Sequence, residues 1–190
     1  MTSTTFDTTL FDQRTPPEQN NVVCIPQALL PPDEREAGDD VPTYDELEKV
    51  SPLPHLPDRL FPRGLPFPPR MEFGFPISDE QIVALHKLEA PDDDRPIFLE
   101  DGTLSSRTLG FATKRLRREV GHRIDFRYVT AKGLNFIVSC CDNYQYHRRD
   151  RRPTDDSTEK MRNYLGLDPN AHPHWYVDAA DYFWGKGYFD

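Results

Sequence analysis

Cysteine is scarce in this sequence, which contains Cys24 and the adjacent pair Cys140 and Cys141 among 190 residues. Three cysteines do not make a disulfide framework, and the first residues show no apolar leader for secretion. Stable disulfides belong to oxidising compartments, whereas free thiols persist inside the cell. We therefore expect an intracellular protein, in the nucleus or the cytoplasm.

The chain also lacks long hydrophobic runs and the short motifs of common catalytic sites. No run approaches the ~18 apolar residues that a membrane helix requires, so we expect no contact with a membrane. Neither a glycine-rich phosphate loop nor a Gly-x-Ser-x-Gly elbow is present. No pair of cysteines has the Cys-x-x-Cys spacing of a zinc site. These absences predict a non-catalytic protein without a metal or a cofactor.

Proline, by contrast, is abundant and unevenly placed. Of the 19 prolines, 14 lie at or before Pro76. Proline fixes φ and removes a backbone donor, so no helix or central strand is expected through residues 52–76, which we call the proline-rich segment. Its leucines and phenylalanines indicate a strap over a folded domain or a segment that binds a partner. We predict a disordered or strap-like region at 1–75 and one compact domain at 76–190.

Hydrophobic residues at helical spacing predict three helices in that domain. They are expected at 78–88, 105–120 and 157–165, each preceded or opened by a residue that can cap its first amides. Gly121 is placed to end the second helix in a left-handed conformation. A short strand is expected near Pro96. The predicted fold class is therefore mainly α with a small β element, in a single helical domain.

Residues 124–141 fit two patterns. With a period of two, Ile124, Phe126 and Tyr128 alternate, and the chain reverses at 131–133 into a second strand. With a period of 3.6, apolar residues of the same stretch line up on one face of a helix. A hairpin beside a helix would suggest a winged DNA-binding module, whereas a second helix would suggest a different fold.

Charge of both signs is plentiful but separated along the chain. The formal net charge is -9, yet residues 107–152 hold 12 Lys or Arg against 4 Asp or Glu. The cations of the predicted helix at 105–120, the basic helix, and of residues 147–152, the basic loop, could bind phosphates, or form a solvated face balanced by nearby acids. The candidate nucleic-acid-binding residues are Arg107, Lys114, Arg115, Arg117, Arg118, Arg148, Arg149, Arg151 and Arg152.

Aromatic residues gather near the C-terminus. Residues 175–189 include two tryptophans, three tyrosines and two phenylalanines. Aromatic side chains at this density usually close a core or form an interface. The alternative to nucleic-acid binding is therefore a protein-interaction or structural module, whose protein partner would contact residues 52–76 or the aromatic tail at 175–189.

Three pieces of the chain occur in an order that is similar to a known family. The basic helix ends in Leu116-Arg117-Arg118-Glu119-Val120-Gly121, then comes Ile124-Asp125-Phe126-Arg127-Tyr128, and Asn163-Tyr164-Leu165-Gly166-Leu167 precedes Tyr176 by nine residues. This order resembles the C-terminal half of the catalytic domain of tyrosine recombinases, the phage-integrase family. The resemblance implies that Arg127 lies where the second catalytic arginine would be, and Tyr176 where the nucleophile would be.

The chain departs from that family at two motif positions, and it has no convincing equivalent of the first catalytic arginine or of the hairpin lysine. Ile124 stands in place of the motif histidine, and Leu167 in place of the later histidine or tryptophan. Strand cleavage needs a tyrosine aimed at a phosphate that several donors clamp. Since donors of this clamp are missing, we predict a non-catalytic nucleic-acid-binding protein with a degenerate recombinase-like domain, whose partner would be duplex DNA.

Overall fold

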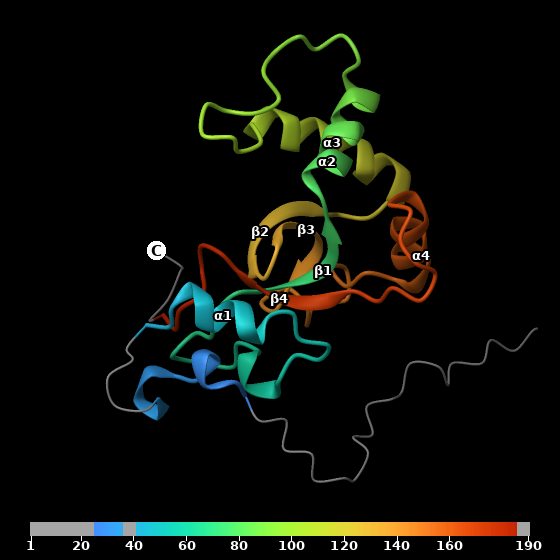
Figure 1. Ribbon diagram of the computed structural model, residues 1–190. Coiled ribbons are helices and arrows are strands. Elements are labelled where there is room, and N and C mark those ends of the chain that lie inside the picture. The colour runs from blue at the N-terminus through green and yellow to red at the C-terminus, as the bar shows by residue number, and fades with distance from the viewer. Residues whose placement is uncertain (1–24, 36–40, 186–190) are drawn as a thin grey trace, which may run out of the picture.

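The computed structural model describes residues 25–35 and 41–185, and a closed barrel of four antiparallel strands lies at its centre (Figure 1). The strands follow one another around the barrel in the order β1-β3-β2-β4. Their bounds are Met71–Ile77 for β1, Asp125–Ala131 for β2, Leu134–Asp142 for β3 and His174–Asp178 for β4. Residues 1–24, where disorder was expected, lie outside the described ranges. Residues 186–189, the last of the predicted aromatic tail, lie outside them as well.

The fold class predicted from the sequence, mainly α, is wrong. Helix makes up 33% of the structure and strand 21%, and the strands form the central barrel rather than a small accessory element. The error arose at β1 and β4. β1 contains Gly74 and Pro76, which disfavour strands, and β4 has only five residues. The two strands pair across the length of the domain, Met71 opposite Val177, so no local pattern signals them.

Residues 124–141, for which the sequence allowed a hairpin or a helix, form a hairpin. β2 and β3 pair in antiparallel register, with Phe126 opposite Val138. Gly133 turns the chain with a φ of 69°, in the left-handed region that glycine adopts without strain. The β-branched and aromatic residues of this stretch pack well on a pleated surface, and this preference prevails over the helical period.

The three helices predicted in the domain are confirmed. They are α2 (Asp79–Glu89), α3 (Ser106–Val120) and α4 (Asp155–Tyr164), which begin after the capping residues Ser78, Ser105 and Thr154. Gly121 follows α3 with a φ of 70°, as predicted. A further helix, α1 (Tyr44–Val50), begins at a threonine-glutamate capping box. The short strand expected near Pro96 is reduced to a single bridge between Phe98 and Leu104.

Apolar side chains pack in three clusters around and within the barrel. Phe75 belongs to the cluster under α2, α3 and α4, and Trp175 to the cluster that joins the barrel to α1 and the proline-rich segment. Figure 1 shows α2 and α3 on one side of the barrel and α1 on the other. The third cluster contains Ile137 and Tyr176. Because neighbours along a strand point to opposite faces, Trp175 faces outward and Tyr176 faces the barrel interior.

Residues 52–70 of the proline-rich segment lie along the outside of the barrel, whereas residues 71–76 belong to β1, so the expectation that no central strand runs through 52–76 is wrong. Leu53 forms two backbone hydrogen bonds with Trp175, at 2.7 and 2.9 Å, and Phe67 forms two with Gly185, at 2.8 and 3.0 Å. Short 3₁₀ helices lie at Gln27–Leu29, Pro32–Glu34 and Asp58–Leu60. The two segments that the sequence suggested for a protein partner therefore contact each other within the fold.

Candidate functional site

The basic helix, which is α3, carries cations that bind acids of the same molecule. Lys114 and Arg118 both reach Glu89 at the end of α2, at 2.9 and 2.7 Å. Arg107 binds Asp93 at 2.8 Å. Hydrogen bonds from Lys114 and Arg118 lower the pKa of Glu89, so this carboxylate stays charged opposite them.

Arg115 and Arg117 of the same helix are also engaged. Arg115 donates to the Tyr164 hydroxyl at 2.8 Å and pairs with Glu119 at 2.9 Å. Arg117 donates to the carbonyl oxygen of Ile124 at 2.7 Å. All five cations predicted on this helix therefore have an acceptor within the fold, and three carboxylates, those of Glu89, Asp93 and Glu119, balance part of its positive charge.

The basic loop keeps an excess of positive charge. Its four arginines are accompanied by a single acid, Asp150. Arg148 lies 3.7 Å from that aspartate and is more than half exposed. Arg149 is exposed, and no ion pair links it to another residue of the described ranges. Arg148 and Arg149 are therefore the cations of this loop that are best placed to meet a ligand from solution.

The other two arginines of the loop turn back toward the fold. Arg151 lies 3.4 Å from Asp150 and is three-quarters buried. Arg152 donates to the carbonyl oxygen of Tyr146, and its guanidinium lies 4.4 Å from the centre of that ring. The first contact lies within the basic loop, and the second joins the loop to Tyr146, the residue that precedes it.

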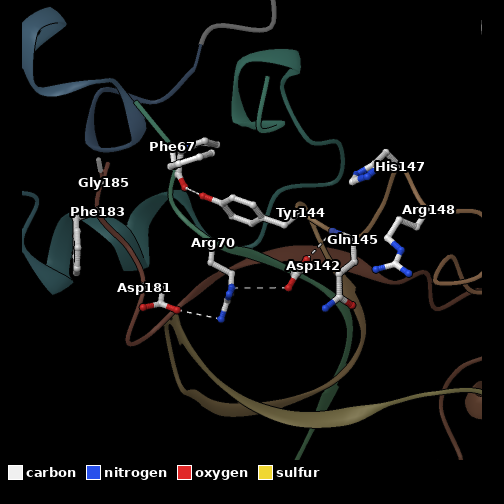
Figure 2. A pocket seen from close by; sticks show the side chains of 11 residues that line it. Phe67, Arg70, Asp142, Tyr144, Gln145, His147, Arg148, Asp181, Phe183 and Gly185 are labelled. Atoms are coloured by element: carbon white, nitrogen blue, oxygen red, sulfur yellow. Dashed lines mark hydrogen bonds and ion pairs between the residues drawn. The ribbon is translucent and has the colours of Figure 1, made fainter. Parts of the chain in front are cut away.

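A pocket of about 350 Å³, which we call the aromatic pocket, opens beside the basic loop (Figure 2). Its walls come from three parts of the chain, namely the proline-rich segment, the loop after β3 and the segment after β4. Three aromatic rings line it, those of Phe67, Tyr144 and Phe183, together with His147 and Arg148 of the basic loop. Aromatic rings next to an arginine suit a flat, conjugated ligand that carries negative charge.

Buried hydrogen bonds attach the loop after β3 to the proline-rich segment. The side chain of Asn143 donates to the carbonyl oxygens of Leu60 and Pro69 at 2.6 and 3.0 Å. Its Oδ1 accepts from the backbone amide of Met71 at 3.0 Å. Since Asn143 is fully buried and fully bonded, it sets the position of the neighbouring Tyr144.

Arg70 joins the remaining walls of the aromatic pocket. Figure 2 shows its guanidinium between two carboxylates, those of Asp142 at 3.7 Å and Asp181 at 3.0 Å. The Tyr144 hydroxyl donates to the carbonyl oxygen of Pro68. The pocket is therefore held in shape by contacts within the chain, as ligand pockets usually are.

Glu72, which the sequence analysis did not single out, is buried inside the barrel. It lies opposite Tyr176 in the register between β1 and β4, and 2% of its surface is exposed. The Ser139 hydroxyl donates to Glu72 Oε2 at 2.5 Å. Glu72 Oε1 has no hydrogen-bond partner among the described residues, and the Arg127 Nε lies 3.8 Å from it.

Burial raises the pKa of Glu72 from 4.5 to about 7, because the charged carboxylate loses its hydration in the barrel. The hydrogen bond from Ser139 and the charge of Arg127 lower this pKa, while the charges of Asp142 and Asp178 raise it. Burial is the largest of these effects. Glu72 is therefore able to gain or lose a proton near neutral pH.

A small polar recess adjoins Glu72. Its volume is about 40 Å³, enough for about one water molecule. Asp142 and Gln145 line both this polar recess and the aromatic pocket. The ionisable carboxyl in the barrel and the aromatic pocket are thus neighbours that share a wall.

The two residues matched to the recombinase motifs lie on adjacent strands next to Glu72. Arg127 on β2 is 43% exposed at its side chain and reaches Glu72 at 3.8 Å and Asp125 at 3.6 Å. Tyr176 on β4 faces Glu72 and is buried. Burial raises the pKa of the Tyr176 hydroxyl, which disfavours the phenolate that would act as a nucleophile.

The described cysteines are free and unreactive near neutral pH. Burial raises the pKa of Cys140 to about 12 and raises that of the adjacent Cys141 as well, so neither forms a thiolate readily. Within the described ranges, no three His, Cys, Asp or Glu side chains come together in a way that could hold a metal ion. The described helices also include none that is both long and apolar enough to cross a membrane.

Comparison with known proteins yields no relative from which a function can be transferred. No protein-family model, curated protein or solved structure matches the chain significantly. Function is therefore inferred from the chemistry of the site.

Sequence reasoning missed the aromatic pocket because its walls are distant in the chain. Phe67 and Phe183 stand in two different apolar segments, and nothing in the sequence shows that both meet Tyr144. Glu72 could have been noticed, because it is the single charged residue in the run at 71–77. A buried acid with a perturbed pKa is a common mark of a functional site.

Proposed function

We propose that the protein binds single-stranded nucleic acid through the aromatic pocket and the basic loop. The observation that carries this proposal is the meeting of three aromatic rings with His147 and Arg148 around one pocket (Figure 2). Aromatic side chains stack on unpaired bases of any sequence, while arginines bind the phosphates between them. A volume of about 350 Å³ lies near the lower end of ligand pockets, which suits one base with its sugar.

The basic loop supports this proposal better than the basic helix does. A nucleic acid on α3, the surface expected from the sequence, would compete with Glu89 for Lys114 and Arg118 and with Asp93 for Arg107. Arg149 has no ion pair with any residue in the described part of the chain that a phosphate would have to displace. In duplex DNA the bases stack on one another and cannot enter an aromatic pocket, so we favour an unpaired strand.

The protein-interaction alternative has less support in the described part of the chain. The proline-rich segment and the aromatic tail contact each other through Leu53 and Trp175 and through Phe67 and Gly185. Their apolar side chains pack in one cluster with the outer face of the barrel. A partner would have to separate these segments before it could reach the side chains that pack in this cluster.

Replacing Arg148 and Arg149 together by alanine is expected to weaken the binding of a labelled single-stranded oligonucleotide about tenfold at low salt. Two lost phosphate contacts should also reduce the slope of log affinity against log salt concentration by about 1.4, since each contact on a single strand contributes about 0.7. Fluorescence anisotropy at several salt concentrations measures both quantities.

The matched control is Lys114→Ala with Arg118→Ala, which removes the same charge from α3. Because both side chains already bind Glu89, this variant should bind the oligonucleotide as the unaltered protein does. If the helix variant lost affinity while the loop variant kept it, the interface would lie on α3 and the proposal would be wrong.

Phe183→Ala is expected to weaken binding about tenfold without changing the salt dependence, since stacking on one base contributes about 1–3 kcal/mol. Phe98→Ala is the control. The exposed fraction of Phe98 is 44%, close to the 39% of Phe183, but Phe98 does not line the aromatic pocket. Anisotropy with the same oligonucleotide compares the two. Equal affinities for both variants would argue against stacking in the aromatic pocket.

A further inference from the structure

Glu72 lies where its charge can act on the aromatic pocket. It is opposite Asp142 in the register between β1 and β3. Asp142 lines both the polar recess and the aromatic pocket, and its carboxylate lies 3.7 Å from Arg70 in the pocket wall. Asp142 and its ion-pair partner Arg70 therefore lie between the carboxylate of Glu72 and the aromatic pocket.

The barrel interior suits the neutral form of Glu72. Oε2 lies 2.5 Å from the Ser139 hydroxyl, which in turn lies 3.4 Å from the carbonyl oxygen of Cys141. The Ser139 hydroxyl donates to the ionised carboxylate, and on protonation this bond can reverse, so that the carboxyl donates to Ser139 and Ser139 donates to the carbonyl oxygen of Cys141. Among the described residues, only an uncharged Oε1 is then left without a hydrogen-bond partner. In the ionised acid, the charged Oε1 has Arg127 at 3.8 Å, beyond hydrogen-bond distance.

We infer that Glu72 is a proton-uptake site that regulates the aromatic pocket, which binds an anionic strand more tightly when Glu72 is protonated. This inference rests on the proposed function. Ionisation of Glu72 adds a negative charge behind Asp142 and repels the phosphates of the strand. In partly screened surroundings, one charge at about a Debye length changes affinity about fivefold. By linkage, binding of the strand favours proton uptake by Glu72 to the same extent.

Charged and titratable groups lie near Glu72 on every neighbouring strand. The residues that line the polar recess with Glu72 include Arg123, Asp125, Arg127, Cys140, Cys141 and Asp142, while Tyr176 lies opposite Glu72 on β4 and Asp178 of the same strand raises its pKa. Burial raises the pKa values of both thiols and of the tyrosine hydroxyl, so these three groups are neutral near neutral pH. Glu72, with its pKa of about 7, is the buried acid that changes charge there.

The test measures the affinity for a labelled single-stranded oligonucleotide at constant ionic strength, at about pH 6 and about pH 8.5, on either side of the titration of Glu72. All proteins carry His147→Gln, because histidine changes charge in the same range and this one lines the pocket. We expect the His147→Gln protein to lose about fivefold in affinity at the higher pH. Glu72→Gln in the same background imitates the neutral acid and should keep the tighter affinity at both pH values.

Arg127→Gln provides a second variant, whose half-exposed side chain can be replaced without opening the barrel. Loss of its charge raises the pKa of Glu72, so the change in affinity should move to higher pH. The inference would be overturned if Arg127→Gln did not move the pH at which affinity changes. It would also be overturned if the Glu72→Gln protein lost as much affinity at the higher pH as the protein that keeps Glu72. Either result would leave the proposed function standing. Absence of binding at about pH 6 by the protein that retains His147 would overturn the proposed function, and the inference with it.

Discussion

Gly74→Ala is expected to prevent folding or to lower the free energy of unfolding by about 4 kcal/mol or more. A Cβ at this position would lie 2.0 Å from the backbone oxygen of Val138, and only a movement of β3 could relieve that clash. The ladder between β1 and β3 continues beside Gly74, with Phe75 opposite Val138, so separating the two backbones there would disrupt this pairing. Chemical denaturation followed by the fluorescence of Trp175 in β4 measures the effect.

Gly110→Ala is the matched control, because it adds the same methyl group to another glycine. Gly110 lies within α3, is exposed, and has no atom within 4 Å of the added Cβ. Alanine at an exposed helix position stabilises by about 0.5–1 kcal/mol relative to glycine. The two substitutions should therefore have opposite signs. A Gly74→Ala protein as stable as the unaltered one would mean that β1 and β3 do not approach as closely as described.

Glu72→Gln is expected to raise the free energy of unfolding by about 3 kcal/mol above about pH 8 and to change it little below about pH 4. The unfolded chain loses the Glu72 proton near pH 4.5, whereas the folded barrel keeps it up to about pH 7. Between these values the folded state holds more protons than the unfolded state, so stability falls as pH rises. Glutamine has no proton to lose and avoids this fall.

Denaturant titrations across this pH range measure the difference between variant and unaltered protein. Glu159→Gln is the control, because it removes an exposed carboxylate on α4, outside the barrel. Its effect on the free energy of unfolding should not follow the pH dependence expected for Glu72→Gln. A pH-independent difference for Glu72→Gln would show that the pKa of Glu72 is the same in the folded and the unfolded state, and that the inference about its proton is mistaken.

The helices were predictable because their signals are local. Ser78 and Ser105 cap the helices that follow them, and Gly121 ends α3, in agreement with the expected positions. Each signal depends on residues within one or two turns of the chain. The sequence of the hairpin allowed two interpretations, because its apolar residues fit both the period of two of a strand and the period of 3.6 of a helix. The chain adopts strands because β2 and β3 pair with each other.

The barrel and the candidate site depend on residues that are distant in the chain. Arg118 and Glu89 are 29 residues apart, so the sequence showed a concentration of positive charge and not the acid that balances it. Glu72 lies opposite Tyr176 only because β4 returns to β1. The basic loop was found from composition alone, while the aromatic rings beside it belong to three separate segments.

The place of β4 between β1 and β2 has a consequence for synthesis on the ribosome. α2, α3 and the hairpin can form as soon as they emerge, but β1 and β2 each keep an open edge until His174–Asp178 has been made. Unpaired strand edges next to apolar surface attract other chains. A nascent chain of this protein would therefore need protection, by a chaperone or by fast translation of its final segment, during the interval before the barrel closes.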